Sequence, residues 1–238
     1  MNRRVFLFVL FLNFILLARL SGTSPSDSES YKNPSVQQDT LPVNQILFNG
    51  RVWTNQYYMV EKDQFLFSKD FLPGTLTITG KTFTNVSIRY DLFKDELLTP
   101  FPPVGILQVN KEMVDSFSVL FQNKLYHFIR IPEDSLNVLS GYLNVLYKGK
   151  SALYVKYNKK IDRPTREGEN DKFYQLSHIY FEKNNRHSLI TSKRDLYRIF
   201  YREKVQIKAF IKKNKIRVSK NNPESFIPVI RYYDTISQ

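Results

Sequence analysis

The sequence predicts an α+β protein: a mainly antiparallel β-meander, forming a curved sheet or partial barrel, followed by two C-terminal helices that pack on it. Three observations lead to this prediction. Residues 46–190 contain β-branched and aromatic runs that are separated by tight-turn residues. From Thr191 the apolar residues recur at the helical period instead. The chain also contains 19 Phe and 15 Tyr, and aromatic side chains suit a pleated, half-buried surface.

Residues 1–22 are typical of a signal peptide. Arg3 and Arg4 precede an apolar run of 14 residues, which is shorter than the roughly 20 residues that a bilayer span requires. We therefore expect cleavage after Gly22 and no transmembrane helix in the mature chain; an uncleaved membrane anchor is the alternative. Residues 23–45 are rich in Ser, Pro, Asp and Gln, which predicts a flexible leader before the globular domain.

Residues 46–190, the predicted meander, carry a recurring turn signal. Gly or Asn precedes a basic residue between apolar runs, and both residue types tolerate the positive φ of tight hairpins. These turns are Gly50-Arg51, Gly80-Lys81, Asn123-Lys124, Gly149-Lys150 and Asn185-Arg186, and their unequal spacing excludes a fixed-period repeat. The predicted strands are 46–53, 57–67, 75–79, 82–92, 104–109, 115–121, 124–131, 141–147, 150–158 and 173–182.

Residues 191–238 are predicted to be helical and to belong to the same globular domain as the sheet. The first helix spans about residues 191–216, with Ser192 as its N-cap and Asp195 in its first turn, where a carboxylate is favoured. Its apolar residues fall within an arc of about 120°, so this face should pack on the sheet. They are Leu196, Ile199, Phe200, Ile207, Phe210 and Ile211.

A second, shorter helix is predicted near the end of the chain. Pro223 suits its first position, because the missing amide hydrogen is not needed there. Pro228 should kink or shorten the helix, since proline removes an interior hydrogen bond. One side is apolar and consists of Phe226, Ile227, Ile230 and Tyr233.

Five short stretches of the chain carry a resemblance to other sequences. They are "IRYDL" (88–92), "DSF" (115–117), "VLYKGK" (145–150), "KAFIKKNKI" (208–216) and "RYYDTI" (231–236). Through them the chain resembles, from about Phe48 to Ile236, a family of uncharacterised exported proteins of Gram-negative bacteria. The resemblance implies export and the overall architecture, and it implies no catalytic residue.

The sharpest functional feature is the charge of the first C-terminal helix. Between Lys193 and Lys220 there are eleven Lys or Arg residues against two acidic residues, a large share of the formal net charge of +13. Such a face can hold phosphates, an anionic polysaccharide or lipid headgroups. The alternative is a solvated outer face that keeps the protein soluble. The candidate anion-binding residues, with Tyr197 and Tyr201 among them, are Arg194, Arg198, Lys204, Lys208, Lys212 and Lys215.

Glu203 is a candidate buried charge. It lies at the centre of the apolar arc of the first helix, and its neighbours four residues away are Ile199 and Ile207. Because an unpaired buried carboxylate is costly, we expect a basic residue or a tyrosine of the sheet to meet it. The alternatives are a loosely packed, hydrated helix and a catalytic acid or base.

Several kinds of active site find no support in the residue pattern. The chain contains no cysteine, and its three histidines lack the spacing of a metal site. No nucleophile elbow or phosphate-binding glycine loop is present. The acidic residues Asp91, Asp95 and Glu96 surround a turn, and we interpret them as turn formers. We therefore assign no catalytic, metal-binding or cofactor-binding residue.

These observations favour an exported, non-catalytic protein with a binding or structural role in the cell envelope, in the periplasm or associated with the outer membrane or the exterior. Its partners would be an anionic envelope polymer, lipid headgroups or another envelope protein. Nucleic acid is a less favoured anion, because it is scarce outside the cytoplasm. The alternatives are a hydrolase whose site follows no motif and a carrier of lipids or other hydrophobic ligands.

Overall fold

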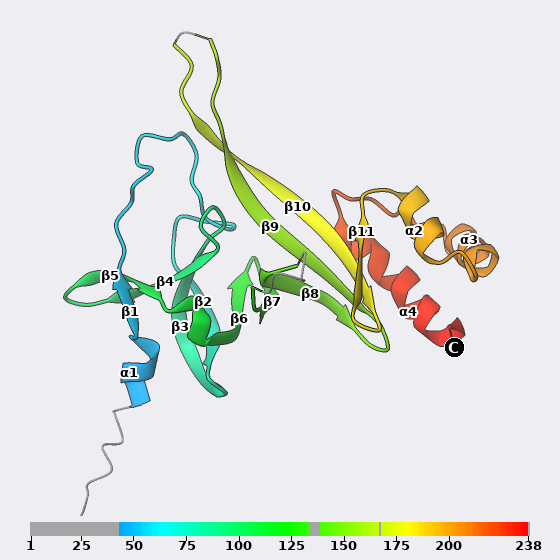
Figure 1. Ribbon diagram of the computed structural model, residues 1–238, viewed down its shortest axis with the longest axis horizontal. Coiled ribbons are helices and arrows are strands. Elements are labelled where there is room, and N and C mark those ends of the chain that lie inside the picture. Colours follow the sequence, from blue (N-terminus) through cyan, green and yellow to red (C-terminus); the bar gives the residue numbers. More distant parts are fainter. Residues whose placement is uncertain (1–42, 134–138, 167, 238) are drawn as a thin grey trace, which may run out of the picture. The chain divides into compact units, whose positions relative to one another are not determined.

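The computed structural model describes residues 43–133, 139–166 and 168–237 (Figure 1). The predicted signal peptide and residues 23–42 of the predicted leader lie outside these ranges. The described chain is mostly antiparallel sheet with helices at its C-terminus, which confirms the predicted class at this level. Its open sheet runs in the order β1 (Gly50–Val52), β5 (Gly105–Val109), β4 (Glu96–Phe101), β3 (Lys81–Asp91), β2 (Leu72–Ile78), β6 (Val114–Phe121), β7 (Lys124–Ile131), β8 (Gly141–Lys148), β9 (Ala152–Asp162), β10 (Lys172–Lys183) and β11 (Arg186–Ile190).

The strand order departs from a simple meander at two places. β2 pairs with β6 as well as with β3, and β5 pairs with β1 as well as with β4. Between these two places, β3 pairs with two strands along its length, β2 and β4. Its residues up to Ile88 pair with β2, whereas Arg89–Asp91 pair with β4. The β3-β4-β5 hairpins therefore leave the second edge of β2 free, and β6 occupies it.

Three of the predicted hairpin turns are confirmed by their backbone. Gly80, Asn123 and Asn185 have φ values of 78°, 60° and 58°, in the left-handed region that these residue types tolerate. The turn predicted at Gly50-Arg51 is wrong, because both residues belong to β1. The segment before it, Val43–Leu47, is the short helix α1, which the sequence reading had assigned partly to the leader and partly to a strand.

The strand predicted over 57–67 is wrong. This segment forms turns and isolated bridges, Glu61 with Lys172 and Phe65 with Asp91. Its aromatic residues pack without a strand: the Tyr57 ring lies 4.9 Å from that of Phe93 and 5.9 Å from that of Phe173, both in edge-on contacts. β4, by contrast, was not predicted as a strand.

The turn of the β8-β9 hairpin contains the predicted pair Gly149-Lys150 and also Ser151. Lys148 pairs with Ala152 and Val145 with Tyr154, with an irregularity between Val145 and Tyr147. Asp234 of α4 (Ile227–Ile236) contacts this turn. Its carboxylate accepts hydrogen bonds from the Ser151 amide at 3.0 Å and the Ser151 hydroxyl at 2.7 Å.

The single long helix predicted over about 191–216 is two helices, α2 (Lys193–Ile199) and α3 (Lys204–Lys213). Glu203 lies at the break, directly before α3, and is half-buried. A continuous helix would carry this carboxylate at the centre of its buried face, which is costly. The predicted buried charge is therefore wrong, and the expected ion pair of Glu203 is not found among the described residues.

The end of the chain also differs from the prediction. The 3-10 helix η2 (Pro223–Phe226) leads into α4 (Ile227–Ile236), so three α-helices follow β11 within the described ranges, where two helices were predicted. Pro228 occupies the first turn of α4 and produces no interior kink, because the first turn of a helix requires no amide donor from it.

The C-terminal helices pack on one end of the sheet order (Figure 1). Leu196, Phe200, Ile207 and Ile230 are each fully buried in one apolar cluster that also contains sheet residues. None of the helices in the described ranges has the length and apolarity that crossing a membrane requires. The sheet residues of this apolar cluster are Leu153, Val155, Ile179, Phe181 and Ile190.

Candidate functional site

The first two C-terminal helices form a hollow that we call the basic groove. Its volume is about 530 Å³. α2 provides the first part of its lining, and the following turn and α3 provide the rest, so the break between the helices shapes it. Five of its seven lining residues are cationic and the other two are tyrosines: Lys193, Arg194, Tyr197, Arg198, Tyr201, Lys204 and Lys208.

Most of the positive charge in the basic groove has no acidic partner. Arg198 pairs with Asp195 at 2.8 Å, and this is the one ion pair that a groove residue makes within the described ranges. The Lys193 and Lys208 amines lie 5.7 and 5.3 Å from the ring centre of Tyr197, so both form cation–π contacts with the same aromatic side chain. Like charges gathered in this way repel one another, and an anion would relieve the repulsion.

Asp195, the acid that pairs with Arg198, forms most of its hydrogen bonds at the start of α2. Its carboxylate accepts hydrogen bonds from the Thr191 hydroxyl at 2.6 Å and the Thr191 amide at 3.1 Å. These bonds, with a further one from Ser192, lower the pKa of Asp195 to about 2. The Ser192 side chain in turn accepts from the Asp195 amide, which confirms the predicted N-cap. Asp195 therefore stays ionised, and its charge offsets that of Arg198 alone.

The apolar backing of the groove is tightly packed. Phe200 is fully buried, and its ring lies 4.1 Å from that of Tyr233 on α4 and 4.9 Å from that of Phe181 on β10. Such aromatic contacts fix the turn between α2 and α3, because large buried rings tolerate little displacement. The cationic side chains are consequently presented from a rigid base.

The structure brings together four of the six predicted anion-binding residues. Arg194, Arg198, Lys204 and Lys208 line the groove, whereas Lys212 and Lys215 lie outside its lining. Lys215 follows α3 in a left-handed conformation with φ of 52°. The prediction included them because it assumed one continuous helix. It missed Lys193, although the local excess of basic residues already contained it.

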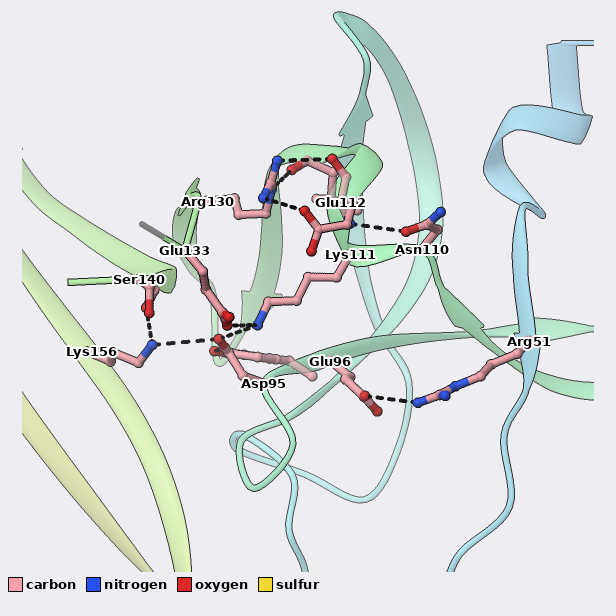
Figure 2. Close-up of polar contacts among 12 residues, drawn as sticks. Arg51, Asp95, Glu96, Asn110, Lys111, Glu112, Arg130, Glu133, Ser140 and Lys156 are labelled. Atoms are coloured by element: carbon pink, nitrogen blue, oxygen red, sulfur yellow. Dashed lines mark hydrogen bonds and ion pairs between the residues drawn. The ribbon is translucent and has the colours of Figure 1, made fainter. Parts of the chain in front are cut away.

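The acidic residues around the β3-β4 turn have separate partners, and Asp95 is the centre of one network (Figure 2). Its carboxylate lies 2.9 Å from the Lys111 amine and 3.6 Å from the Lys156 amine, and it accepts a hydrogen bond from the Tyr90 hydroxyl. Gly141 lies against this network, because a β-carbon there would collide with the Asp95 carboxylate. Asp95 therefore braces the turn against the neighbouring strands.

Glu96 and Asp91 form a cross-strand pair between β4 and β3. Glu96 accepts a hydrogen bond from Arg51 at 3.3 Å, as Figure 2 shows. Asp91 is 1% exposed; one of its oxygens accepts from the Phe93 and Lys94 amides, and the other has no hydrogen-bond partner among the described residues. Burial raises the pKa of Asp91 to about 6, and the charge of Glu96 contributes to the rise.

The interpretation of these acids as turn formers is thus confirmed for Asp91, which caps the turn with one oxygen, and for Asp95, which lies in the turn with a left-handed φ of 57°. Glu96 is the first residue of β4. Sequence reasoning missed that Asp91 is buried and that Glu96 faces it. The available signal was their spacing. Two acids that flank a four-residue loop face each other when the flanking strands pair directly.

Four of the five stretches that carry the sequence resemblance meet in pairs in the structure. Asp234, from "RYYDTI", accepts a hydrogen bond from the Tyr147 hydroxyl at 3.0 Å, and Tyr147 belongs to "VLYKGK". Tyr90, from "IRYDL", packs edge-on against Phe117, from "DSF", at 5.3 Å. These contacts hold helix to sheet and strand to strand, so the stretches have structural roles.

Comparison with known proteins finds no family model, no curated protein and no solved structure that matches the chain. The resemblance to exported proteins of Gram-negative bacteria therefore stays a prediction. Within the described ranges, no group of three or more His, Asp or Glu residues could hold a metal ion.

Proposed function

We propose that this chain is an exported, non-catalytic binding protein of the cell envelope and that its basic groove holds an anionic surface polymer or lipid headgroups. The observation that carries the proposal is the charge of the groove. Lys193, Arg194, Lys204 and Lys208 surround one hollow, and no acid pairs with them in the described part of the chain.

The chemistry of the groove favours phosphate, sulfate or carboxylate groups. Arg194 offers a planar guanidinium that can bind two oxygens at once, whereas the lysines act as point charges. Tyr197 and Tyr201 add hydroxyl groups and an apolar surface for the stem of the ligand. The contact would be weak and sensitive to salt, because exposed charges are screened.

A solvated outer face is the competing explanation. The two explanations differ in whether the position of a cation in the structure affects anion binding. If the cations serve solubility alone, any four of them are equivalent. If they bind an anion, the four that surround the groove matter and four elsewhere do not. Net charge is the same in both sets, so the comparison separates position from count.

The test measures binding to heparin and to lipopolysaccharide at about 50 mM salt, where surface charges are weakly screened. The groove variant carries Lys193→Gln, Arg194→Gln, Lys204→Gln and Lys208→Gln. The matched control variant carries Lys81→Gln, Lys148→Gln, Lys150→Gln and Lys160→Gln, four exposed lysines outside the groove lining.

We expect the groove variant to lose about tenfold or more in affinity and the control variant to lose about threefold or less. Equal losses would show that net charge alone attracts the polymer, and would overturn the proposal. Vesicles that contain phosphatidylglycerol distinguish the sources of the anion: heparin binding without vesicle binding indicates a polymer, and vesicle binding that depends on the groove residues indicates lipid headgroups.

A further inference from the structure

A second hollow, which we call the polar pocket, lies at the other end of the strand order. Its volume is about 430 Å³, within the range of small-ligand sites. β1, β5, β4 and β3 are neighbours there, and the segment after β1 completes the lining. Six of the lining residues are Arg51, Trp53, Tyr57, Gln64, Asp91 and Glu96.

Asp91 provides the polar pocket with an acceptor that the fold does not satisfy. One carboxylate oxygen is buried without a hydrogen-bond partner among the described residues. Gln64 is 2% exposed. It lies beside Asp91, because its backbone carbonyl accepts a hydrogen bond at 2.9 Å from the amide of Leu92, the next residue in the chain. A buried acceptor without a donor is unfavourable, and a ligand hydroxyl that moved the covering side chains aside and donated to this oxygen would relieve that cost.

The charges of the polar pocket are balanced. Arg51 pairs with Glu96 at 3.3 Å and donates to Gln108 at 2.7 Å, so its guanidinium is already committed. The Lys94 amine lies 5.6 Å from the ring centre of Tyr57, and Asp91 carries the opposite charge in the same lining. A ligand with a net charge would therefore meet both signs, whereas an uncharged ligand with many hydroxyls meets donors and acceptors.

Trp53 and Tyr57 provide aromatic surfaces for such a ligand. Both are half-buried, and the Trp53 amide is held by the carbonyl of Ile106 at 2.9 Å. Together with Gln64 they also line an adjoining hollow of about 490 Å³. Two hollows that share three lining residues fit a ligand with more than one ring.

We infer that the polar pocket binds a short neutral saccharide, whose hydroxyls bond to Asp91, Glu96 and the amides of Gln64 and Gln108 while a sugar ring lies on Trp53 or Tyr57. This site is independent of the basic groove, since the two share no lining residue. The saccharide is recognised by hydrogen bonds and aromatic contact, so its binding does not depend on salt.

Trp53 makes the inference directly testable, because it is the single tryptophan of the chain. Its emission and its indole N–H resonance therefore report on the polar pocket and the adjoining hollow, and on no other tryptophan. The full chain is titrated with cellobiose, maltose and N-acetylglucosamine, up to about the 0.1 M that weak sugar sites require. We expect a saturable change in both signals with at least one of these sugars.

Asp91→Asn is the main variant, because it removes the carboxylate yet can still accept from the Phe93 and Lys94 amides. It should weaken saccharide binding at least about fivefold. Glu96→Gln is the second variant, in case Asp91→Asn fails to fold, and it should weaken binding at least about threefold. The groove variant serves as the control and should bind the saccharide as the unaltered chain does.

Three results would overturn the inference. The first is the absence of any Trp53 response to all three sugars, and the second is a response that both pocket variants retain in full. The third is a response to methylammonium at millimolar concentration without one to sugars, which would make the pocket a cation site.

Discussion

The basic groove and the polar pocket hold charge in opposite ways. In the groove, five cations face one hollow, and Arg198 alone has an acidic partner within the described ranges. In the pocket, two cations and two acids balance, and the acid Asp91 is buried. Exposed unpaired charge costs little and attracts a charged partner from a distance. Buried charge costs stability and makes a specific hydrogen-bonding group available.

The two regions are also held in place by different carboxylates. Asp234 ties α4, which backs the groove, to the β8-β9 turn through Tyr147 and Ser151. Asp95 braces the β3-β4 turn, which carries the pocket acids, through Lys111 and Lys156. Stability should therefore depend on the carboxylates and hardly at all on the groove cations.

The largest expected effect is that of Asp234→Ala. It leaves the Ser151 amide and the Tyr147 hydroxyl without their acceptor, and Asp234 is 7% exposed, so the free energy of unfolding should fall by about 4 kcal/mol. Asp234→Asn keeps an acceptor and should lose about half as much. Urea unfolding of both variants measures this. Equal losses would mean that the negative charge matters and the acceptor geometry does not.

The next effect depends on pH. The pKa of Asp91 is raised from 3.8 to about 6. Between these two pH values the Asp91 carboxyl is therefore still protonated in the native state but ionised in the unfolded chain. The contribution of Asp91 to stability is complete below pH 4 and is lost as the pH rises through 6, by about 3 kcal/mol in all. We expect the stability difference between the unaltered chain and Asp91→Asn to fall over this window. A difference that is constant with pH would contradict the burial of Asp91.

The Asp95 brace should contribute less, because it is partly exposed. Asp95→Ala should lower the free energy of unfolding by about 2 kcal/mol, since the Lys111 and Lys156 amines lose their shared acceptor but can still reach water. It should also weaken saccharide binding, because the β3-β4 turn positions Asp91 and Glu96. Chemical denaturation and a Trp53 titration measure the two effects. Unchanged binding in a destabilised variant would show that the turn keeps its form without Asp95.

The smallest expected effect on stability is that of a groove cation. Lys204→Gln should change the free energy of unfolding by less than about 0.5 kcal/mol, because this exposed side chain has no ion pair within the described ranges. Its heparin affinity should nevertheless fall measurably. A loss of stability without a loss of heparin binding would make the cation structural and would remove the contrast with the pocket.

The groove was largely predictable because its residues lie close together in the sequence. A count of charges between Lys193 and Lys220 was sufficient to find it. The break at Glu203 was not predicted, because helical periodicity gives no weight to the cost of a carboxylate on the buried face. The break determines which cations share the hollow, so the predicted residues Lys212 and Lys215 lie outside its lining.

The pocket was not predictable, because its lining comes from positions between Arg51 and Gln108 that only the strand order brings together. Each lining residue looks ordinary in its own stretch. The sheet itself shows the same limit. Alternating runs such as β3 and β9 were found, whereas the pairing of β2 with β6 depends on which edge is free and leaves no trace in local sequence.

One measurement tests most directly whether the two regions are separate sites of different chemistry. Heparin and cellobiose are titrated into the groove variant and into Asp91→Asn, and both titrations are repeated at about 50 and 200 mM salt. The groove variant should lose heparin binding alone, and Asp91→Asn should lose cellobiose binding alone. Salt should weaken only the heparin contact. A variant that loses both ligands, or a cellobiose affinity that falls with salt, would contradict the account.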